Sequence, residues 1–238
     1  MQWYRDLGLE LLEGYGMTEL FGLSHMCRPG QVRVGFVGQP LDGVDCKLSA
    51  AGEVLIRSPA NTLGYYRDPE RTEELFTDGG YIRTGDRGSI DELGRLKITG
   101  RVKEIFKTSK GKYVAPAPIE NKLSEHPGVE ACCVTGANQH QPCALLMLSA
   151  DTLAGLDTHN GRDVLEQSLS RHLATVNSTL DPHERLRFAA VVADEWLVEN
   201  AFLTPTLKVR RNVIEDVYGP HLDEWYATGR SVIWQDAH

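Results

Sequence analysis

The stretch that says most about this protein lies near the start of the sequence and reads Glu13-Gly14-Tyr15-Gly16-Met17-Thr18-Glu19. Two glycines in so short a run let the backbone approach a ligand closely. A hydroxyl and a carboxylate, on Thr18 and Glu19, then stand next to each other at the end of the loop. The hydroxyl can donate to a phosphate oxygen, and the carboxylate is a hard oxygen ligand that suits magnesium. Taken alone, the run fits a simple glycine turn after a strand equally well.

A second polar run, further along the chain, is Tyr81-Ile82-Arg83-Thr84-Gly85-Asp86. Asp86 follows a glycine, where a carboxylate can stand clear of the backbone. Because a carboxylate accepts two hydrogen bonds, Asp86 matches the two hydroxyls of a ribose. The alternative is a turn aspartate that closes a β-hairpin, which is a common arrangement.

Cationic residues form the third and fourth signals. Arg101 and Lys103 lie in the run Gly100 to Glu104, and the guanidinium fork of an arginine suits ribose or phosphate oxygens. Lys103 on its own fits a solvated charged strand better. Lys208 follows an apolar, threonine-rich run, and its mobile charge can bridge a carboxylate and a phosphate. A single lysine in such a place is more often a simple surface residue.

Composition narrows the class of protein. The 238 residues carry 25 Lys and Arg against 33 Asp and Glu, which gives a formal net charge of −8. Such an acidic chain is a poor general binder of nucleic acid or of anionic membranes. No signal peptide or membrane-spanning stretch is recognisable, and the five cysteines contain no C-x-x-C pair. We therefore expect a cytoplasmic protein with reduced thiols, in which the adjacent Cys132 and Cys133 face opposite sides of a strand.

Turn residues and apolar patterns predict short elements in the first half of the chain. The segment 1–12 reads as the end of a helix that runs into a strand. Pro69 at a first helical position, with Asp68 as its cap, predicts a helix over 69–76. Strands are predicted over 32–37, 44–48, 53–56, 87–90 and 95–99.

The second half reads as a small α+β domain. A hairpin with a lysine-rich tip is predicted over 102–114, and an apolar stripe at helical spacing predicts a helix over 163–180. Further helices are predicted over 116–125 and 210–218, strands over 129–134, 144–148 and 188–192, and a short mobile tail at the end. With helices packed on one side of the strands, we expect an α+β fold with a β-rich part over 1–102 and a small domain over 103–238.

Together and in this order, these motifs resemble the adenylate-forming (AMP-binding) superfamily, over about residues 9 to 214. The segments 99–120 and 203–211 are most similar to long-chain acyl-CoA synthetases. The resemblance implies an ATP-dependent ligase that joins a carboxylic acid, such as a long-chain fatty acid, to AMP and then passes the acyl group to coenzyme A. ATP or AMP, Mg²⁺ and coenzyme A are the implied cofactors.

The resemblance also implies a role for each matching residue. Thr18 would contact the adenylate phosphate, Glu19 would bind magnesium, and Tyr15, with Gly16, would pack near the adenine. Asp86 would hold the ribose hydroxyls beside Arg101. The remaining roles fall to Lys103 as the hinge between the two domains, Gly111 in a loop that lines the pantetheine tunnel, and Lys208 as the catalytic cation.

The sequence departs from the family pattern at two places. Lys110 stands where many relatives have a glycine, and it would either narrow the pantetheine tunnel or attract a coenzyme phosphate. The family's phosphate-binding loop, rich in Ser, Thr and Gly and ending in lysine, precedes the tyrosine-glycine motif and is missing here. We therefore expect a truncated, C-terminal part of a longer enzyme that is inactive alone. The alternative is a stand-alone nucleotide-binding or assembly module that pairs with a separate N-terminal chain or forms a homodimer.

Overall fold

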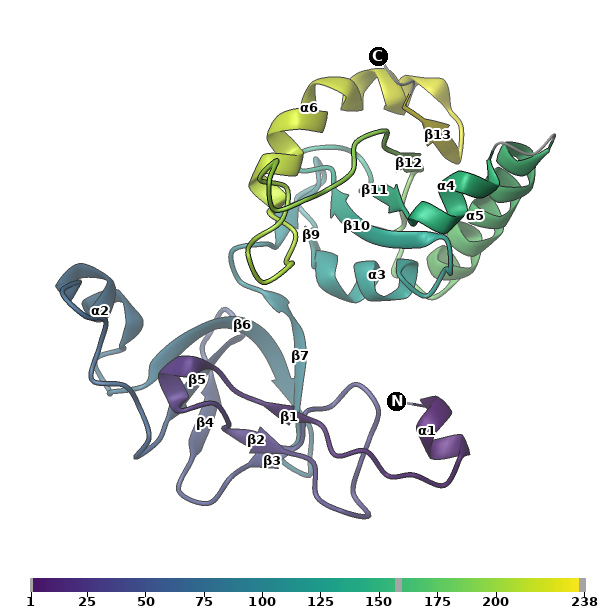
Figure 1. Cartoon of the computed structure of the whole chain (residues 1–238). Coiled ribbons are helices and arrows are strands. Elements are labelled where there is room, and N and C mark those ends of the chain that lie inside the picture. Colours follow the sequence, from purple (N-terminus) through teal and green to yellow (C-terminus); the bar gives the residue numbers. More distant parts are fainter. Residues whose placement is uncertain (1, 157–159, 236–238) are drawn as a thin grey trace. The chain divides into compact units, whose positions relative to one another are not determined.

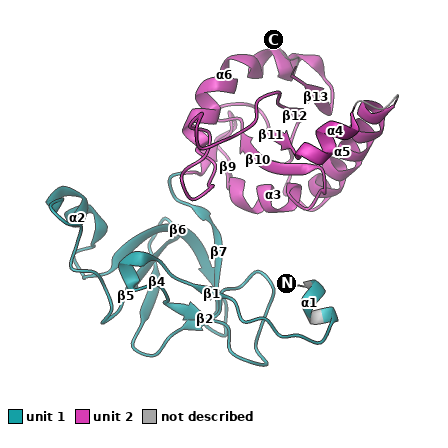
Figure 2. Ribbon diagram, viewed as in Figure 1, with its two compact units in different colours: residues 1–103 teal, residues 104–238 magenta. Residues whose placement is uncertain are grey.

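The computed structural model describes residues 2–156 and 160–235 (Figure 1). It contains two compact units, residues 1–103 and 104–238, which Figure 2 shows in different colours. Strands and helices are mixed in both, and each has its own buried apolar core. The α+β prediction is therefore confirmed, and each unit is described by itself below.

The first unit consists of short antiparallel strands and three short helical segments. Its strands form two sheets, one of order β1-β2-β3 and one of order β4-β5-β6-β7. Six buried residues of the η1, β5, α2, β6 and β7 segments form the core beneath them. In chain order the elements are α1 (Gln2–Asp6), β1 (Gly14–Tyr15), η1 (Thr18–Leu20), β2 (His25–Met26), β3 (Gln39–Pro40), β4 (Asp45–Leu48), β5 (Glu53–Arg57), α2 (Pro69–Leu75), β6 (Ile82–Ile90) and β7 (Leu96–Arg101).

Local signals explain much of this unit. Helix α2 begins at Pro69 as predicted, and the side chain of Asp68 caps it by accepting a hydrogen bond from the Arg71 N–H at 3.1 Å. In the turn between β6 and β7, one oxygen of Asp91 accepts from the N–H groups of Leu93 and Arg95 at 3.0 and 2.9 Å. Those bonds close the hairpin that carries Asp86 on one strand and Arg101 on the other.

Two predictions for the first unit were wrong. Residues 32–37 form a loop instead of a strand, with Gly35 in the left-handed region and the side chain of Phe36 against the guanidinium of Arg33. An apolar run becomes a strand only when a partner strand pairs with it, and here only Val37 reaches one, through its N–H to the Leu96 carbonyl. Helix α1 ends at Asp6, and no strand follows it over residues 7–12.

The second unit is built around one four-stranded sheet of order β10-β11-β12-β13. β10 and β11 are antiparallel, whereas β11 pairs in parallel with β12 and β12 pairs in parallel with β13. A separate two-stranded hairpin, β8-β9, precedes the sheet. The elements are β8 (Phe106–Lys107), β9 (Tyr113–Val114), α3 (Pro116–Leu123), β10 (Val129–Thr135), β11 (Cys143–Leu148), α4 (Ala150–Gly155), α5 (Gly161–Ser178), β12 (Ala189–Val191), α6 (Arg211–Thr228) and β13 (Val232–Trp234).

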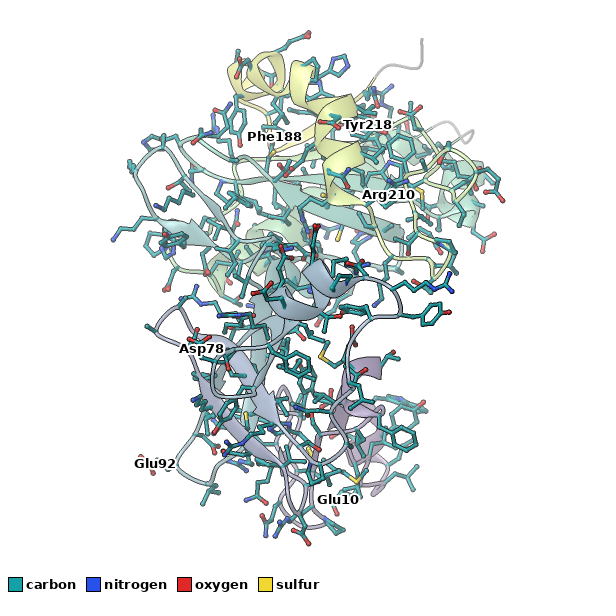
Figure 3. The ribbon with its side chains drawn as sticks, turned by 90° about the vertical axis from the view of Figure 1, so that its left-hand side faces the viewer. Glu10, Asp78, Glu92, Phe188, Arg210 and Tyr218 are labelled. Carbon is teal, nitrogen blue, oxygen red and sulfur yellow. The ribbon has the colours of Figure 1, made fainter. Side chains whose placement is uncertain are left out.

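Helices cover both faces of this sheet, which corrects the expectation of helices on one side. Helices α3 and α5 pack on one face, and α6 packs on the other with Phe188 and Tyr218, labelled in Figure 3. Because side chains alternate along β10, Cys132 belongs to the first of these cores and Cys133 to the second, as predicted. All six residues of β11 are buried, as expected for a strand covered on both sides.

The end of the chain differs from the prediction of a mobile tail. Helix α6 continues ten residues beyond the predicted end at Tyr218, to Thr228, and passes through Pro220. Burial of Trp225 against the sheet holds the second half of the helix despite the proline. Strand β13 then adds to the sheet beside β12, so that described residues up to Gln235 are part of the fold.

All five cysteines are free thiols. No helix within the described part of the chain is long and apolar enough to cross a membrane.

Candidate functional site

Asp86 is the centre of the polar cluster in the first unit. It pairs directly with Arg101 across the β6–β7 ladder, and the Arg101 Nε lies 3.3 Å from the Asp86 Oδ1. The hydroxyl of Tyr15 donates to the other carboxylate oxygen at 2.5 Å. The side chain of Asp86 is 18% exposed, against 52% for Arg101. The carboxylate is therefore largely buried, whereas the guanidinium beside it is accessible to solvent.

The backbone around Asp86 is shaped by its two preceding residues. Gly85 has φ 71°, a left-handed conformation that favours glycine. The buried hydroxyl of Thr84 donates to the Val54 carbonyl at 2.8 Å and accepts from the Asp86 N–H at 3.1 Å. The Thr84-Gly85-Asp86 motif therefore fixes the backbone that carries the Asp86 carboxylate.

Tyr15 presents its hydroxyl as a hydrogen-bond donor. Burial, and secondly the hydrogen bond to Asp86, raise the pKa of Tyr15 far above its ordinary value, so the phenol stays protonated. Its ring packs edge-on against His25, with the ring centroids 5.9 Å apart. The structure thus brings three of the predicted residues together, with Asp86 hydrogen-bonded to Tyr15 and ion-paired with Arg101.

Thr18 and Glu19 lie on the short helical turn η1 of the same unit. Thr18 is exposed, and its hydroxyl makes no hydrogen bond with any residue that the structure describes. One carboxylate oxygen of Glu19, Oε1, accepts the hydroxyl of Tyr65 at 2.7 Å. This hydrogen bond and then burial raise the pKa of Tyr65, which keeps it a donor.

The donor set fits a magnesium ion that is held mainly by a nucleotide. Over residues 2–156 and 160–235 no three His, Cys, Asp or Glu side chains gather to hold a metal ion. Glu19 would therefore contribute one oxygen, with phosphate and water supplying the rest. That arrangement is common for Mg²⁺, which usually binds one or two carboxylates together with substrate phosphates.

Gly16 has a packing role in the loop that joins Tyr15 to Thr18. A Cβ at this position would lie 2.0 Å from the Gly22 carbonyl oxygen. The loop closes tightly because the N–H of Gly22 donates to the Met17 carbonyl at 3.0 Å. Glycine at position 16 therefore allows the backbone of residues 22 and 23 to approach closely.

The other predicted site residues are placed as follows. Lys103 is exposed and is the last residue of the first unit. Gly111 lies in the turn of the β8–β9 hairpin with φ 73°, and Lys208 is exposed at a tight turn before α6; both belong to the second unit. The turn is closed by the Lys208 N–H donating to the Thr204 hydroxyl at 3.0 Å and by the Thr204 N–H donating to the Lys208 carbonyl at 2.8 Å.

Several residues of the cluster were missed by the sequence reasoning. Tyr65 is 46 positions away from Glu19, and no spacing rule connects the two. The Ser24 hydroxyl donates to the Tyr15 carbonyl at 3.0 Å and is hydrogen-bonded to the Nδ1 of His25, also at 3.0 Å. His25 lies opposite Tyr15 in the β1–β2 pair, a placement that no local sequence signal indicates.

His25 is completely buried and electrically neutral. Its Nδ1 is hydrogen-bonded to the Ser24 hydroxyl, and its Nε2 is buried with no partner among the described residues. A second proton on the imidazole would create a buried positive charge that water cannot solvate. Burial therefore lowers the pKa of His25 to about 4.

We expect acid to destabilise the first unit through His25, the only histidine of residues 1–103. Because the folded pKa, about 4, lies below the unfolded value of 6.5, the unfolded chain binds more protons between these two pH values. The contribution of neutral His25 to the free energy of unfolding is complete above pH 6.5. It is lost at about 1.4 kcal/mol per pH unit as the pH falls toward 4. Hydrogen exchange of the β5–β7 amides from pH 5 to 7 measures the opening free energy of the unit. This free energy should depend less steeply on pH in His25→Leu than in the wild type. Equal slopes in the two proteins would contradict the role of His25.

Comparisons with known proteins agree with the resemblance seen in the motifs. Residues 103–230 match the family model of the AMP-binding enzyme C-terminal domain. The chain is 31% identical over 235 residues to the long-chain-fatty-acid–CoA ligase FadD15 of Mycobacterium bovis; the match covers 94% of this chain but 39% of that ligase. The chain thus spans well under half the length of this curated relative.

Two solved structures share the fold. The adenylation domain of a carboxylate reductase from Mycobacterium chelonae has a TM-score of 0.77 at 24% identity, covering 95% of this chain and 36% of that one. The anthranilate–CoA ligase AuaEII, solved with anthranoyl-AMP, has a TM-score of 0.69 at 25% identity, covering 90% of this chain and 41% of that one. The motifs, the family model and the similar ligase agree, and the chain belongs to the AMP-binding, adenylate-forming enzyme family.

Proposed function

We propose that this chain is the nucleotide-binding and C-terminal part of an AMP-forming carboxylate–CoA ligase, with a long-chain fatty acid as its substrate. The observation that carries the proposal is the cluster in which Tyr15 and Arg101 both bind the carboxylate of Asp86. The fatty acid is inferred from the 31% identity to a long-chain-fatty-acid–CoA ligase. Residues 1–102 would be the end of the large AMP-binding domain and 103–238 its small C-terminal domain.

Asp86 would hold the ribose. One oxygen accepts the Tyr15 hydroxyl and the other is ion-paired with Arg101, so the carboxylate keeps lone pairs that can accept the two ribose hydroxyls. The half-exposed guanidinium of Arg101 lies beside it with donors to spare for a ribose or phosphate oxygen. The ring of Tyr15, packed on His25, would border the adenine.

Thr18 and Glu19 would bind the phosphate end of the nucleotide. The exposed hydroxyl of Thr18 is free to donate to a phosphate oxygen, and Glu19 would supply one oxygen to magnesium beside it. Lys208 would neutralise charge at the α-phosphate, where a positioned cation lowers the barrier most. Lys103 would be the hinge, and Gly111 would lie in the loop along the pantetheine of coenzyme A.

When bound, ATP supplies the α-phosphorus that a carboxylate attacks with loss of pyrophosphate, and coenzyme A supplies the thiol that takes the acyl group. The residues of this chain bind and orient these partners. The 238 residues contain no Ser, Thr and Gly-rich loop ending in lysine before Tyr15. We therefore propose that adenylation at an ordinary enzymatic rate needs residues beyond these, and that the chain by itself binds nucleotide without efficient turnover.

Calorimetric titration with a non-hydrolysable acyl-AMP analogue tests the nucleotide site. Replacement of Asp86 with alanine should weaken binding by roughly tenfold or more, about 1.4 kcal/mol, because the ribose hydroxyls lose their acceptor. The matched control is Asp78→Ala, which removes an exposed carboxylate of the same unit (Figure 3) and should leave the affinity unchanged. Absence of binding by the wild type, or equal losses in both variants, would count against the site.

A second candidate function is assembly with another chain. The first 26 residues expose several large apolar side chains, among them Trp3, Leu7 and Phe21, the last of them 89% exposed. Exposed large apolar side chains can mark an interface where they gather into one patch. Light scattering tests self-association: a mass that rises with concentration supports it, and a constant monomer mass opposes it.

A further inference from the structure

The segment around Tyr65 holds Glu19 at two points. The backbone N–H of Thr62 donates to the Glu19 carbonyl at 2.8 Å, and the hydroxyl of Tyr65 donates to the Glu19 Oε1 at 2.7 Å. Both the main chain and the carboxylate of Glu19 are thus anchored to one distant stretch of sequence. A carboxylate held in this way loses the freedom to rotate that an exposed glutamate keeps.

Tyr65 is itself fixed by the start of helix α2. Its N–H donates to the Thr72 hydroxyl at 2.8 Å, and that hydroxyl donates to the Asp68 carbonyl at 2.7 Å. The guanidinium of Arg71 lies 4.7 Å from the centre of the Tyr65 ring. Gly64 permits this packing, since a Cβ there would lie 2.4 Å from the Thr72 methyl.

The two carboxylate oxygens of Glu19 differ in their hydrogen bonding. Oε1 accepts the phenol, whereas Oε2 makes no hydrogen bond or ion pair with the residues that the structure describes. A carboxylate with one oxygen bound to a fixed donor presents the other in a defined direction, as outer-shell partners of metal ligands do. Tyr65 therefore has the geometry of a residue that orients a ligand.

We propose that Tyr65 is a positioning residue, whose hydroxyl orients Glu19 so that its Oε2 is available to the magnesium ion that accompanies the nucleotide phosphates. This inference rests on the proposed function, in which Glu19 binds that ion. Tyr65 acts through Glu19 and has no contact of its own with the cation. Removal of its hydroxyl should weaken the contribution of magnesium to nucleotide binding and leave magnesium-free binding as it was.

The test is calorimetric titration with α,β-methylene-ATP, with and without Mg²⁺. In Tyr65→Phe the gain in affinity that Mg²⁺ brings should fall by roughly tenfold, at unchanged affinity without Mg²⁺. Tyr66→Phe is the matched control, because its neighbouring side chain is 86% exposed and makes no contact with Glu19. In the Glu19→Gln background, Tyr65→Phe should have no further effect.

The outcomes separate this inference from the proposed function. Equal losses with and without Mg²⁺ in Tyr65→Phe, or an intact Mg²⁺ gain, would overturn the positioning role and leave the nucleotide site standing. A wild type that binds the analogue without any Mg²⁺ gain would do the same. No binding under either condition would overturn the proposed function and the inference with it. Urea unfolding of the wild type, Tyr65→Phe, Glu19→Gln and the double variant gives a second readout, in which the two effects should be non-additive.

Discussion

Replacing Arg211 with methionine should destabilise the second unit by about 3–5 kcal/mol, because it leaves a buried carboxylate without its partner. The guanidinium of Arg211 donates to the Glu120 Oε1 at 2.6 Å and to the Val134 carbonyl at 2.5 Å. The two charged side chains are 15% and 18% exposed. Methionine fills a similar volume but supplies neither charge nor donor, so the carboxylate of Glu120 keeps only the N–H of Val134.

Urea unfolding followed by tryptophan fluorescence measures this effect, since Trp196, Trp225 and Trp234 all lie in the second unit. The control is Arg210→Met at the adjacent position, labelled in Figure 3, where the exposed side chain makes no hydrogen bond or ion pair within the described residues. It should change stability by less than about 0.5 kcal/mol. Comparable losses at the two positions would show that the buried pair is not the cause.

The pair can also be removed as a whole. Glu120→Leu combined with Arg211→Met takes away the buried charge together with its partner, and the double variant should be more stable than Arg211→Met alone. The ion pair links helix α3, strand β10 and the first residue of α6, which follows the loop that carries Lys208. Loss of the pair should therefore loosen the base of that loop as well.

Gly16→Ala should destabilise the first unit by about 3 kcal/mol, the upper end of the usual cost of overpacking. The added methyl would meet backbone atoms, the Gly22 carbonyl oxygen at 2.0 Å and the Leu23 Cα at 2.7 Å, and neither can rotate away as a side chain could. The turn that follows Tyr15 would have to open. Since Thr18 and Glu19 lie on that turn, affinity for the acyl-AMP analogue should fall in parallel with stability.

Hydrogen exchange of the amides of Leu20, Gly22 and Ser24 reports on this turn, because all three donate to carbonyls of residues 15–17. The control is Gly79→Ala, where the nearest atom to an added Cβ is 3.6 Å away, an ordinary contact. Gly79→Ala should leave the exchange of these amides unchanged. Unchanged exchange in Gly16→Ala would mean that the loop yields at little cost and that the close approach is not what selects glycine.

The predictions that succeeded depend on signals a few residues long. Asp68 and Pro69 mark the start of α2, and an apolar residue every third or fourth position marks α5. The alternation that separates Cys132 from Cys133 is likewise a property of neighbouring residues. Where the prediction failed, at residues 32–37 and after Tyr218, the outcome depended on distant partners: the missing strand has no neighbour along most of its length, whereas Trp225 and β13 find one in the sheet.

Some residues of the candidate site could likewise be recognised from the sequence, and others only from the structure. Tyr15, Thr18, Glu19, Asp86 and Arg101 were recognised as residue types in a characteristic order, and the structure shows three of them bonded to one another. Tyr65 and His25 could not be recognised, because nothing in their immediate neighbourhood distinguishes a phenol that holds a carboxylate from a surface tyrosine, or a buried neutral imidazole from an exposed one.

The order and chemical type of the motif residues, read along the sequence, were by themselves enough to determine the family, the mixed α+β class and the kind of ligand expected. The tertiary structure alone decided which donor each carboxylate receives: Tyr15 for Asp86, Tyr65 for Glu19 and Arg211 for Glu120, over separations of 71, 46 and 91 residues. The physical reason is the short range and directionality of the hydrogen bond, which requires two atoms about 3 Å apart. Spacing along the chain carries no information about such a contact until the fold has brought the two segments together.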